Sequence, residues 1–296
     1  LVQPGVAVPT AHLVEVLNSY AATQLFVQQA RLAATDFTLD RATGSAIVQI
    51  CQLVQGLPLG IELAATWVRL LSCTEIAAEI AHNLDFLENN LADAPAQQRS
   101  LRAVFHHSWR LLSAPEQQCL RQLALFRGGF TRAAAAQVAG ATLALLAALV
   151  DHSFVRRRMP APATGTDSAD AARANTDGDA GSIRYELPEV IRQFAAEQLA
   201  LAGEQALIAA RHADCYTTLL ASQRLSLQGA DQSAALHTIS TDIENIRTAW
   251  QWSGSQLSEG GLAYLARGLD ALFHFYDMRS WFQEGAAVFM QTATQV

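Results

Sequence analysis

The 296-residue sequence contains no lysine, so all 20 of its basic residues are arginine. Schiff-base chemistry needs a lysine amine, and a phosphate-binding loop of the GxxxxGK[ST] type needs a lysine on the β- and γ-phosphates. Both are therefore excluded from this chain. The formal net charge of −7 also opposes nucleic-acid binding, although a local basic patch would act against that field.

Long hydrophobic runs are missing too. The longest charge-free apolar run near the middle covers only Leu143 to Val150, far short of the roughly 20 residues that span a bilayer, so we predict no membrane span. The chain begins at Leu1 without an initiator methionine or the layout of a signal peptide, so we expect an excerpt from a longer chain. The four cysteines lack CxxC spacing and lie among apolar residues, which predicts buried, reduced thiols and a cytoplasmic location.

Alanine, the strongest helix former, is abundant, and hydrophobic residues make up 51% of the chain. A chain of this length exceeds what one core usually holds. We predict a mainly α-helical protein in three parts: a helical subdomain at 1–95, a winged-helix domain at 96–200, and the start of a tetratricopeptide-like (TPR-like) array of antiparallel helices at 201–296.

In the first part the stretch Gln55-Gly-Leu-Pro joins two expected helices, at 44–55 and 59–71. Gly56 suits the left-handed position after a helix C-terminus. Pro58 suits the first turn of the next helix, where its missing N–H costs nothing. The end of one helix and the start of the next are enough to explain both residues. The alternative is that this junction, which we call the seam, faces a ligand. Ser72 or Thr74 is expected to cap the next helix, which runs to about Asn83.

The second part is predicted to contain short helices followed by a small β-hairpin, the layout of a winged helix. The expected helices are 100–112, 116–126, 133–138 and 141–151, and the strand candidates are 154–158 and 183–187. Residues 159–182 between the strands are mostly Ala, Thr, Asp, Gly, Ser and Pro, which cannot form a packed core. We predict a disordered insertion there. Further helices are expected at 189–202, 204–228, 232–252, 259–276 and 281–294.

Several short motifs occur in a definite order along residues 1–215. They are Gly56-Leu-Pro-Leu59 with Glu62-Leu-Ala-Ala65, Arg99-Ser-Leu-Arg102, Trp109 with Leu111-Leu112, Leu123 with Phe126 and Gly128-Gly-Phe130, Leu149-Val150-Asp151, and Arg184-Tyr-Glu-Leu-Pro-Glu-Val-Ile-Arg192. In this order they resemble the middle of a STAND-type (NB-ARC-like) regulatory NTPase of the bacterial transcriptional-regulator branch. Beyond residue 215 the chain is only generically similar to the repeat region of that family.

The resemblance implies a switch. In the family an upstream P-loop domain holds ADP or ATP, the helical subdomain and the winged helix close over it as a lid, and a repeat array senses a signal and releases them. It implies a nucleotide-binding contact at Gly56, Leu57 and Pro58, with the proline against the adenine. The phosphate loop and the magnesium-binding strand would lie upstream of Leu1, so we expect no catalytic residue, metal site or bound nucleotide in this segment alone.

One departure from the family concerns a histidine. Relatives outside this branch often carry Met-His-Asp in the winged helix, where the histidine reaches a nucleotide phosphate. The aligned stretch here is Leu187-Pro188-Glu189. The resemblance therefore implies no such phosphate contact in this chain.

A winged helix also suggests DNA binding, but the residues of this one argue against it. The expected third helix, 131–138, offers only Arg132 and Gln137 to base edges. Arg156 to Arg158 on the wing can contact phosphate, but the aspartates of the insertion would repel a duplex.

The adjacent residues His106 and His107 could suggest a metal site. On a helix their side chains point about 100° apart, and no third ligand follows at metal-binding spacing. We therefore expect an ordinary pair of helical residues and no metal site.

The C-terminal stretch is rich in aromatic residues, which we expect to pack between helices, with an exposed remainder lining a groove for a protein partner. They are Trp250, Trp252, Phe273, Phe275, Tyr276, Trp281 and Phe282. We therefore interpret the chain as the regulatory segment of an ATP/ADP-controlled signalling protein that contacts an upstream nucleotide-binding domain. The alternative is a nucleotide-independent helical-repeat scaffold for protein–protein interaction.

Overall fold

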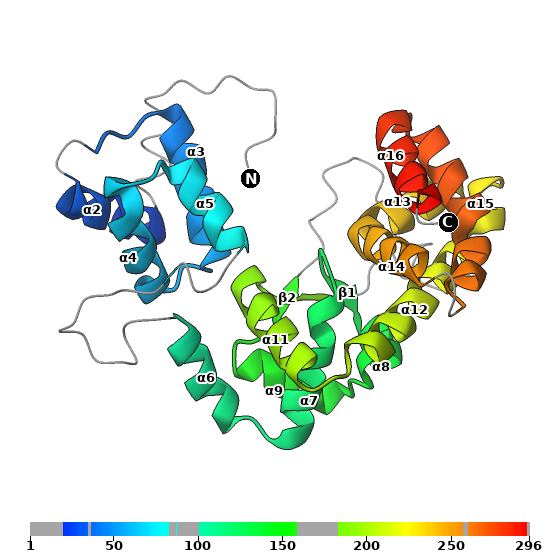
Figure 1. The fold of residues 1–296 in the computed structure, drawn as a ribbon, viewed down its shortest axis with the longest axis horizontal. Helices are drawn as coiled ribbons and strands as arrows, with labels where there is room; N and C mark the ends of the chain where they lie inside the picture. The colour runs from blue at the N-terminus through cyan, green and yellow to red at the C-terminus, as the bar shows by residue number, and fades with distance from the viewer. Residues whose placement is uncertain are drawn as a thin grey trace, which may run out of the picture. The chain divides into compact units, whose positions relative to one another are not determined.

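The computed structural model describes residues 20–34, 37–82, 87, 101–158, 183–256 and 260–294. It is mainly α-helical with one small antiparallel sheet, as the sequence predicted (Figure 1). The chain divides into two compact units. Unit 1 comprises Leu1–Ser113 and Pro188–Phe194, and unit 2 comprises Ala114–Leu187 and Ala195–Val296. The division into three parts stays a prediction.

Unit 1 is a set of helices, drawn in blue and cyan in Figure 1 except for α6, which is blue-green. They are α2 (Ala21–Ala33), α3 (Arg41–Leu53), α4 (Pro58–Thr66), the short 3₁₀ helix η1 (Trp67–Arg69), α5 (Cys73–His82) and α6 (Leu101–Leu111). Helix α2 packs on α4, and α3 packs on α5. Their shared core is formed by fully buried side chains such as Phe26, Ile47, Ile61 and Ile76.

Local capping decides where two helices of unit 1, α3 and α5, begin. The carboxylate of Asp40 accepts a hydrogen bond from the Thr43 amide at 2.8 Å, so α3 starts at Arg41, ahead of the expected Gly44. Of the two caps considered for α5, Ser72 is the one used: its amide donates to Glu75 Oε2 at 2.8 Å, and its Oγ accepts from the Glu75 amide at 3.3 Å. This reciprocal pair is a capping box.

The first half of unit 2 contains the predicted hairpin. Its elements are α7 (Ala114–Gln122), the 3₁₀ helix η4 (Leu123–Leu125), β1 (Phe130–Thr131), α8 (Arg132–Ala139), α9 (Leu143–Asp151), β2 (Arg156–Arg158) and β3 (Arg184–Glu186). Strand β3 lies between β1 and β2 and is antiparallel to both, with Tyr185 opposite Phe130 and Arg157. The hairpin is confirmed, and β1 is a third strand that the sequence did not reveal because it has only two residues. The predicted insertion 159–182 lies outside the described residues.

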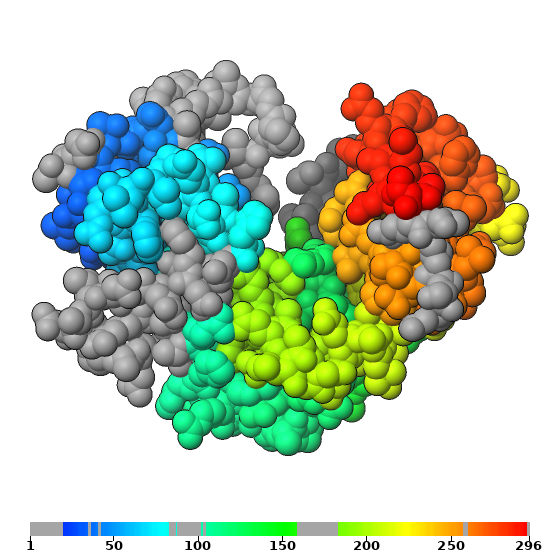
Figure 2. Space-filling view, in the orientation of Figure 1, coloured from blue at the N-terminus to red at the C-terminus, as the bar shows by residue number. Residues whose placement is uncertain are grey.

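The second half of unit 2 is helical. After α11 (Glu189–Leu201), which crosses the boundary between the units, come α12 (Gln205–Leu227), α13 (Gln232–Thr241), α14 (Ile243–Ser255), α15 (Gly261–Met278) and α16 (Phe282–Ala293). Helix α12 packs against α14 and α15, and α16 packs against the same two helices. In the space-filling view the surface of α16, in red, adjoins that of α15, in orange (Figure 2).

The prediction of one helix over 232–252 is wrong, because α13 and α14 are separate and meet at Asp242. The backbone of Asp242 has φ −107° and ψ 13°, outside the helical region, while its side chain bonds to Arg184 of β3. A tertiary contact thus accompanies the break. Among the described residues no single helix is long and apolar enough to cross a membrane, and α8 with α9 meets those criteria only jointly, across a 104° bend.

Candidate functional site

The seam between α3 and α4 is built by two successive left-handed residues. Gln55 has φ 59° and Gly56 has φ 68°, and the Gly56 amide donates to the Cys51 carbonyl at 2.8 Å. This closes the end of α3 in the way expected of a glycine after a helix C-terminus. Leu57 then turns the chain into extended geometry, and Pro58 occupies the first turn of α4.

The seam residues are accessible. Gly56 and Pro58 are exposed and Leu57 is half-buried, whereas Ile61, directly beyond them, is fully buried. A proline sealed in the core could not reach a ligand; this proline is at the surface. The N-cap residue Leu57 makes no side-chain capping bond, so the first amides of α4 have no partner within the helix.

The seam carries no charge. From Gln55 to Ile61 every residue is neutral, and the nearest ionisable side chain in sequence is the exposed Glu62. Cationic side chains are the usual partners of phosphate oxygens, and none is available in this stretch. The seam can therefore offer an apolar ring and a few amides to a base, but no counter-charge to a phosphate.

A polar cluster lies inside unit 2. Arg184 of β3 donates to Asp242 at 2.7 Å and 3.1 Å and to the Gly129 carbonyl at 3.2 Å. Asn245 of α14 donates to the same carbonyl at 2.8 Å and accepts from the Arg127 amide at 2.7 Å. We call these residues, Arg127, Gly129, Arg184, Asp242 and Asn245, the sheet–array network. It fastens the small sheet to the start of α14.

Beside this network lies a buried aromatic cluster that includes His212 of α12. Its ring lies 5.3 Å from that of Phe126 and 4.7 Å from that of Tyr216, centroid to centroid. Burial lowers the pKa of His212 to about 4, and the opposing influence of Asn245 and Asp242 is smaller. The imidazole is therefore neutral at pH 7. Burial, with the nearby charge of Asp242, also raises the pKa of Tyr216 well above its usual value.

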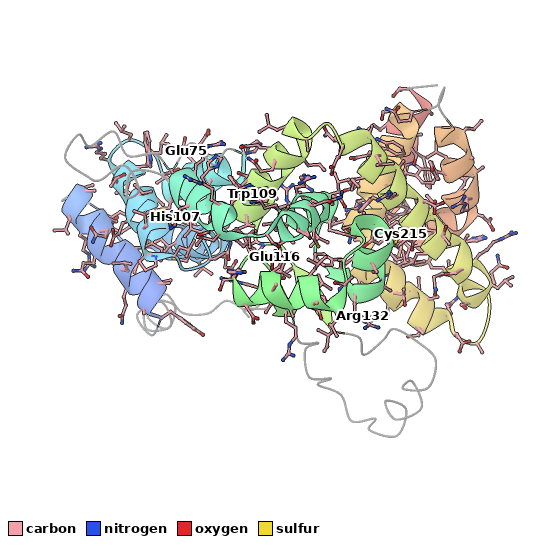
Figure 3. The ribbon with its side chains drawn as sticks, turned by 90° about the horizontal axis from the view of Figure 1, so that it is seen from below. Glu75, His107, Trp109, Glu116, Arg132 and Cys215 are labelled. Carbon is pink, nitrogen blue, oxygen red and sulfur yellow. The ribbon has the colours of Figure 1, made fainter. Side chains whose placement is uncertain are left out.

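The Arg184–Arg192 motif divides between the two units. Arg184 joins the sheet–array network, whereas the residues after Pro188 belong to unit 1. There Gln193 donates to the Ala81 carbonyl at 2.7 Å, at the end of α5. The ring of Phe194 meets Trp109 of α6 edge-on at 5.7 Å, and Figure 3 marks Trp109 and His107 on that helix.

Neither helix that precedes the hairpin has a basic surface suited to DNA. The expected third helix, 131–138, forms α8, and α9 lies between it and the hairpin, in the order that the sequence predicted. The solvent-facing residues of α9 include Leu143, Ala144 and Ala147, and the helix has no basic residue. Arg132, labelled in Figure 3, lies at the start of α8 and is exposed, as is Gln137. Arg156 to Arg158 are exposed on β2, with Arg158 3.9 Å from Glu186.

The cysteines and the pair His106-His107 have the positions expected from ordinary helix packing. All four cysteines are buried and free, as predicted. Burial raises the pKa of Cys51 and Cys73 to about 11 and that of Cys119 and Cys215 to about 12, so these thiols stay protonated and poorly nucleophilic. His106 and His107 are exposed, and the described part of the chain holds no group of three metal-ligating side chains.

The aromatic C-terminal stretch is split between core and surface. Trp250, Phe275 and Tyr276 are buried, as the packing interpretation predicted, while Phe273 and Phe282 are more than half exposed. Trp252 and Trp281 are half-buried.

Sequence reasoning missed Asp242, Asn245 and His212. Asp242 and Asn245 act through partners more than 50 residues away, which no local pattern reveals. For His212 there was a signal: Ile208, His212 and Tyr216 follow one another at intervals of four, which places the histidine on the buried face of its helix.

Comparison with known proteins finds relatives in mycobacteria. A Mycobacterium tuberculosis (strain H37Rv) protein, named as a candidate HTH-type transcriptional regulator, is 32% identical over 272 residues, which are 88% of this chain and 28% of the relative. A Mycobacterium bovis protein with the same kind of name shows the same identity and coverage. A second Mycobacterium tuberculosis protein, named as uncharacterised, is 34% identical over 200 residues, or 64% of this chain and 46% of the relative.

No protein-family model matches the chain, and no solved structure matches it significantly. The chain spans about 28% of the length of the regulators that it resembles.

Proposed function

We propose that this chain is the regulatory segment of an ATP/ADP-controlled, cytoplasmic signal-transduction switch of the transcriptional-regulator type. It closes over nucleotide held by an upstream P-loop domain and passes the state of that nucleotide to the helices that follow. The regulatory part of the proposal is supported by the relatives named as transcriptional regulators, which cover 88% of this chain. The nucleotide part rests on the exposed, uncharged seam Gly56-Leu57-Pro58.

Pro58 is the group that would meet the base. Its ring is rigid, apolar and exposed, and it has no N–H to compete for the acceptors of the purine. The amides of the next residues of α4 lack intrahelical acceptors, and the positive end of the helix dipole lies with them. Such a seam contributes to affinity only when the nucleotide domain lies against it, so nucleotide would favour the closed arrangement over the open one.

Titration with a fluorescent ADP tests this proposal in the longer polypeptide that carries this segment behind a P-loop domain. Pro58→Ala should weaken ADP binding about fivefold, because about 40 Å² of apolar contact corresponds to about 1 kcal/mol. Pro115→Ala is the matched control, since Pro115 is also an exposed proline in the first turn of a helix, α7. It should leave the affinity unchanged. Equal ADP affinity for the Pro58 variant and the unmodified protein would remove Pro58 from the site.

A nucleotide-independent scaffold is the second candidate function. The observation that favours it is the exposed apolar row Leu262, Leu269 and Phe273 on α15, which is suited to contact with another protein. A partner that binds the long polypeptide equally well with ADP, with ATP and without nucleotide would favour the scaffold. Direct DNA binding by this segment is not part of the proposal, because α9 has no basic residue.

A further inference from the structure

A cavity of about 450 Å³ that is open to solvent lies within unit 2, where the end of α11 and the start of α12 face η4 and α14. Small-molecule sites in proteins usually measure about 300–1,000 Å³. The space is thus large enough for a compact organic molecule. All of its lining residues belong to unit 2.

The hollow exists because its wall is made of very small residues. Ala200, Gly203 and Ala206 line it around the turn between α11 and α12. At Gly203, which has φ +69°, an added Cβ would have no atom within 4 Å. The left-handed turn therefore leaves open space where most residues would place a side chain.

The larger lining residues supply recognition chemistry. The indole of Trp252 offers an aromatic face, and the hydroxyl of Thr248 donates to the Glu244 carbonyl at 2.8 Å, which leaves its oxygen able to accept. His212 also lines the cavity and is only 1% exposed. Its Nε2 is buried and has no hydrogen-bond partner among the described residues. An unpaired buried nitrogen is costly. The nitrogen has almost no accessible surface, so a bound group would gain affinity from it once the neighbouring side chains shift to admit the contact.

The charge of the lining limits the class of ligand. The lining contains no Asp, Glu, Lys or Arg, and burial lowers the pKa of His212 to about 4, so the imidazole is neutral at pH 7. A carboxylate or an amine would lose part of its hydration against this lining without meeting a counter-charge. A neutral molecule with a flat apolar body and one hydrogen-bonding group fits these conditions best.

We propose that this cavity binds a neutral aromatic alcohol of one or two rings, whose ring packs against Trp252 and the alanine wall and whose hydroxyl hydrogen-bonds with the imidazole of His212. The site requires no nucleotide and goes beyond the proposed switch. It lies beside the sheet–array network, so occupancy would stabilise the arrangement in which η4, α12 and α14 are packed together.

The probe for the experiment is 1-naphthol, added to the 296-residue chain at pH 7 and followed by ligand-detected NMR and calorimetry. Two comparison compounds separate the contribution of the hydroxyl group from the effect of charge: 1-methylnaphthalene has the same shape without the hydroxyl, and 1-naphthoate carries a charge. We expect 1-naphthol to bind about tenfold more tightly than 1-methylnaphthalene, because one added hydrogen bond to a buried group gives up to about that ratio. It should also bind more tightly than 1-naphthoate, because the charged compound loses hydration without meeting a counter-charge.

Ala206→Trp fills the cavity from an exposed position in α12, so the fold should tolerate it. The matched control is Ala286→Trp, at an exposed helical alanine of α16. We expect the first variant to abolish 1-naphthol binding and the second to leave it unchanged. Binding that survives Ala206→Trp, or no binding to the unmodified chain, would overturn the site.

His212→Phe tests the polar contact. It should reduce 1-naphthol affinity to that of 1-methylnaphthalene while leaving the affinity for 1-methylnaphthalene similar, with circular dichroism used to verify folding. If the variant fails to fold, the comparison of the two compounds on the unmodified chain decides alone. Equal affinity for them there would overturn the role assigned to His212.

Discussion

The guanidinium of Arg184 on β3 lies 2.7 Å and 3.1 Å from the two carboxylate oxygens of Asp242, although 58 residues separate them in sequence. Their side chains are only 17% and 6% exposed. Both groups also bond within the sheet–array network, so their remaining polar atoms are not left facing an apolar core. This pair links the small sheet to the junction between α13 and α14.

Asp242→Ala should reduce the free energy of unfolding of unit 2 by about 3 kcal/mol, because it leaves the buried guanidinium without its carboxylate. Urea unfolding followed by circular dichroism measures this. The control is Arg158→Ala, since Arg158 lies 3.9 Å from Glu186 at the surface and its loss should cost less than about 1 kcal/mol. Similar costs for the two variants would contradict the importance assigned to burial.

The neutral His212 should make unfolding depend on pH. Its pKa is about 4 in the folded chain against an ordinary value of 6.5. Between these values the unfolded chain takes up a proton that the folded chain does not, so the free energy of unfolding should fall as the pH drops from about 6.5 to about 4. Above pH 7 this group should have no effect.

His212→Phe should remove that part of the pH dependence, so the difference between variant and unmodified protein should change by up to about 3 kcal/mol across the interval. Urea unfolding at a series of pH values measures it. Replacement of the exposed His237 with Phe removes one imidazole at the surface and serves as the comparison. Parallel curves for the His212 variant and the unmodified protein would show that His212 does not set the slope.

Thr131 should contribute to stability through the cap of α8. Its Oγ1 accepts a hydrogen bond from the Ala134 amide at 3.2 Å, and its side chain is largely buried. Thr131→Val keeps the shape but loses the acceptor, so it should cost about 1 kcal/mol, whereas Thr131→Ser should retain most of the cap. Chemical denaturation compares them, and a valine variant as stable as the serine variant would contradict the cap.

Substitution of Gly56 should lower stability because of its backbone conformation alone. Its φ is +68°, and the nearest atom to an added Cβ would be Ala22 Cβ, 4.0 Å away, so there is room for the side chain. Gly56→Ala should therefore lower the stability of unit 1 by about 1 kcal/mol, and Gly56→Asn by less, because asparagine tolerates the left-handed region. Thermal unfolding of the two variants tests the order, and alanine proving as stable as glycine would refute it.

Local chemistry made much of the secondary structure predictable. Gly56 and Pro58 mark the end of α3 and the start of α4, Ser72 with Glu75 begins α5, and the strand candidates around residues 156 and 185 do pair. Each of these depends on interactions within a few residues, so each leaves a readable pattern in the sequence. The apolar spacing of the helices likewise predicted a mainly α-helical chain with buried thiols.

Tertiary structure decided what joins these elements. The break at Asp242 and the two-residue strand β1 depend on partners far along the chain, and a one-dimensional pattern cannot specify such partners. The cavity beside His212 depends on where helices stop and on how small side chains face one another across a turn. The sequence by itself determined most of the helices, because capping and apolar spacing act locally. The three-dimensional packing determined the break at Asp242, the sheet–array network and the cavity, because those interactions exist only between residues far apart in sequence.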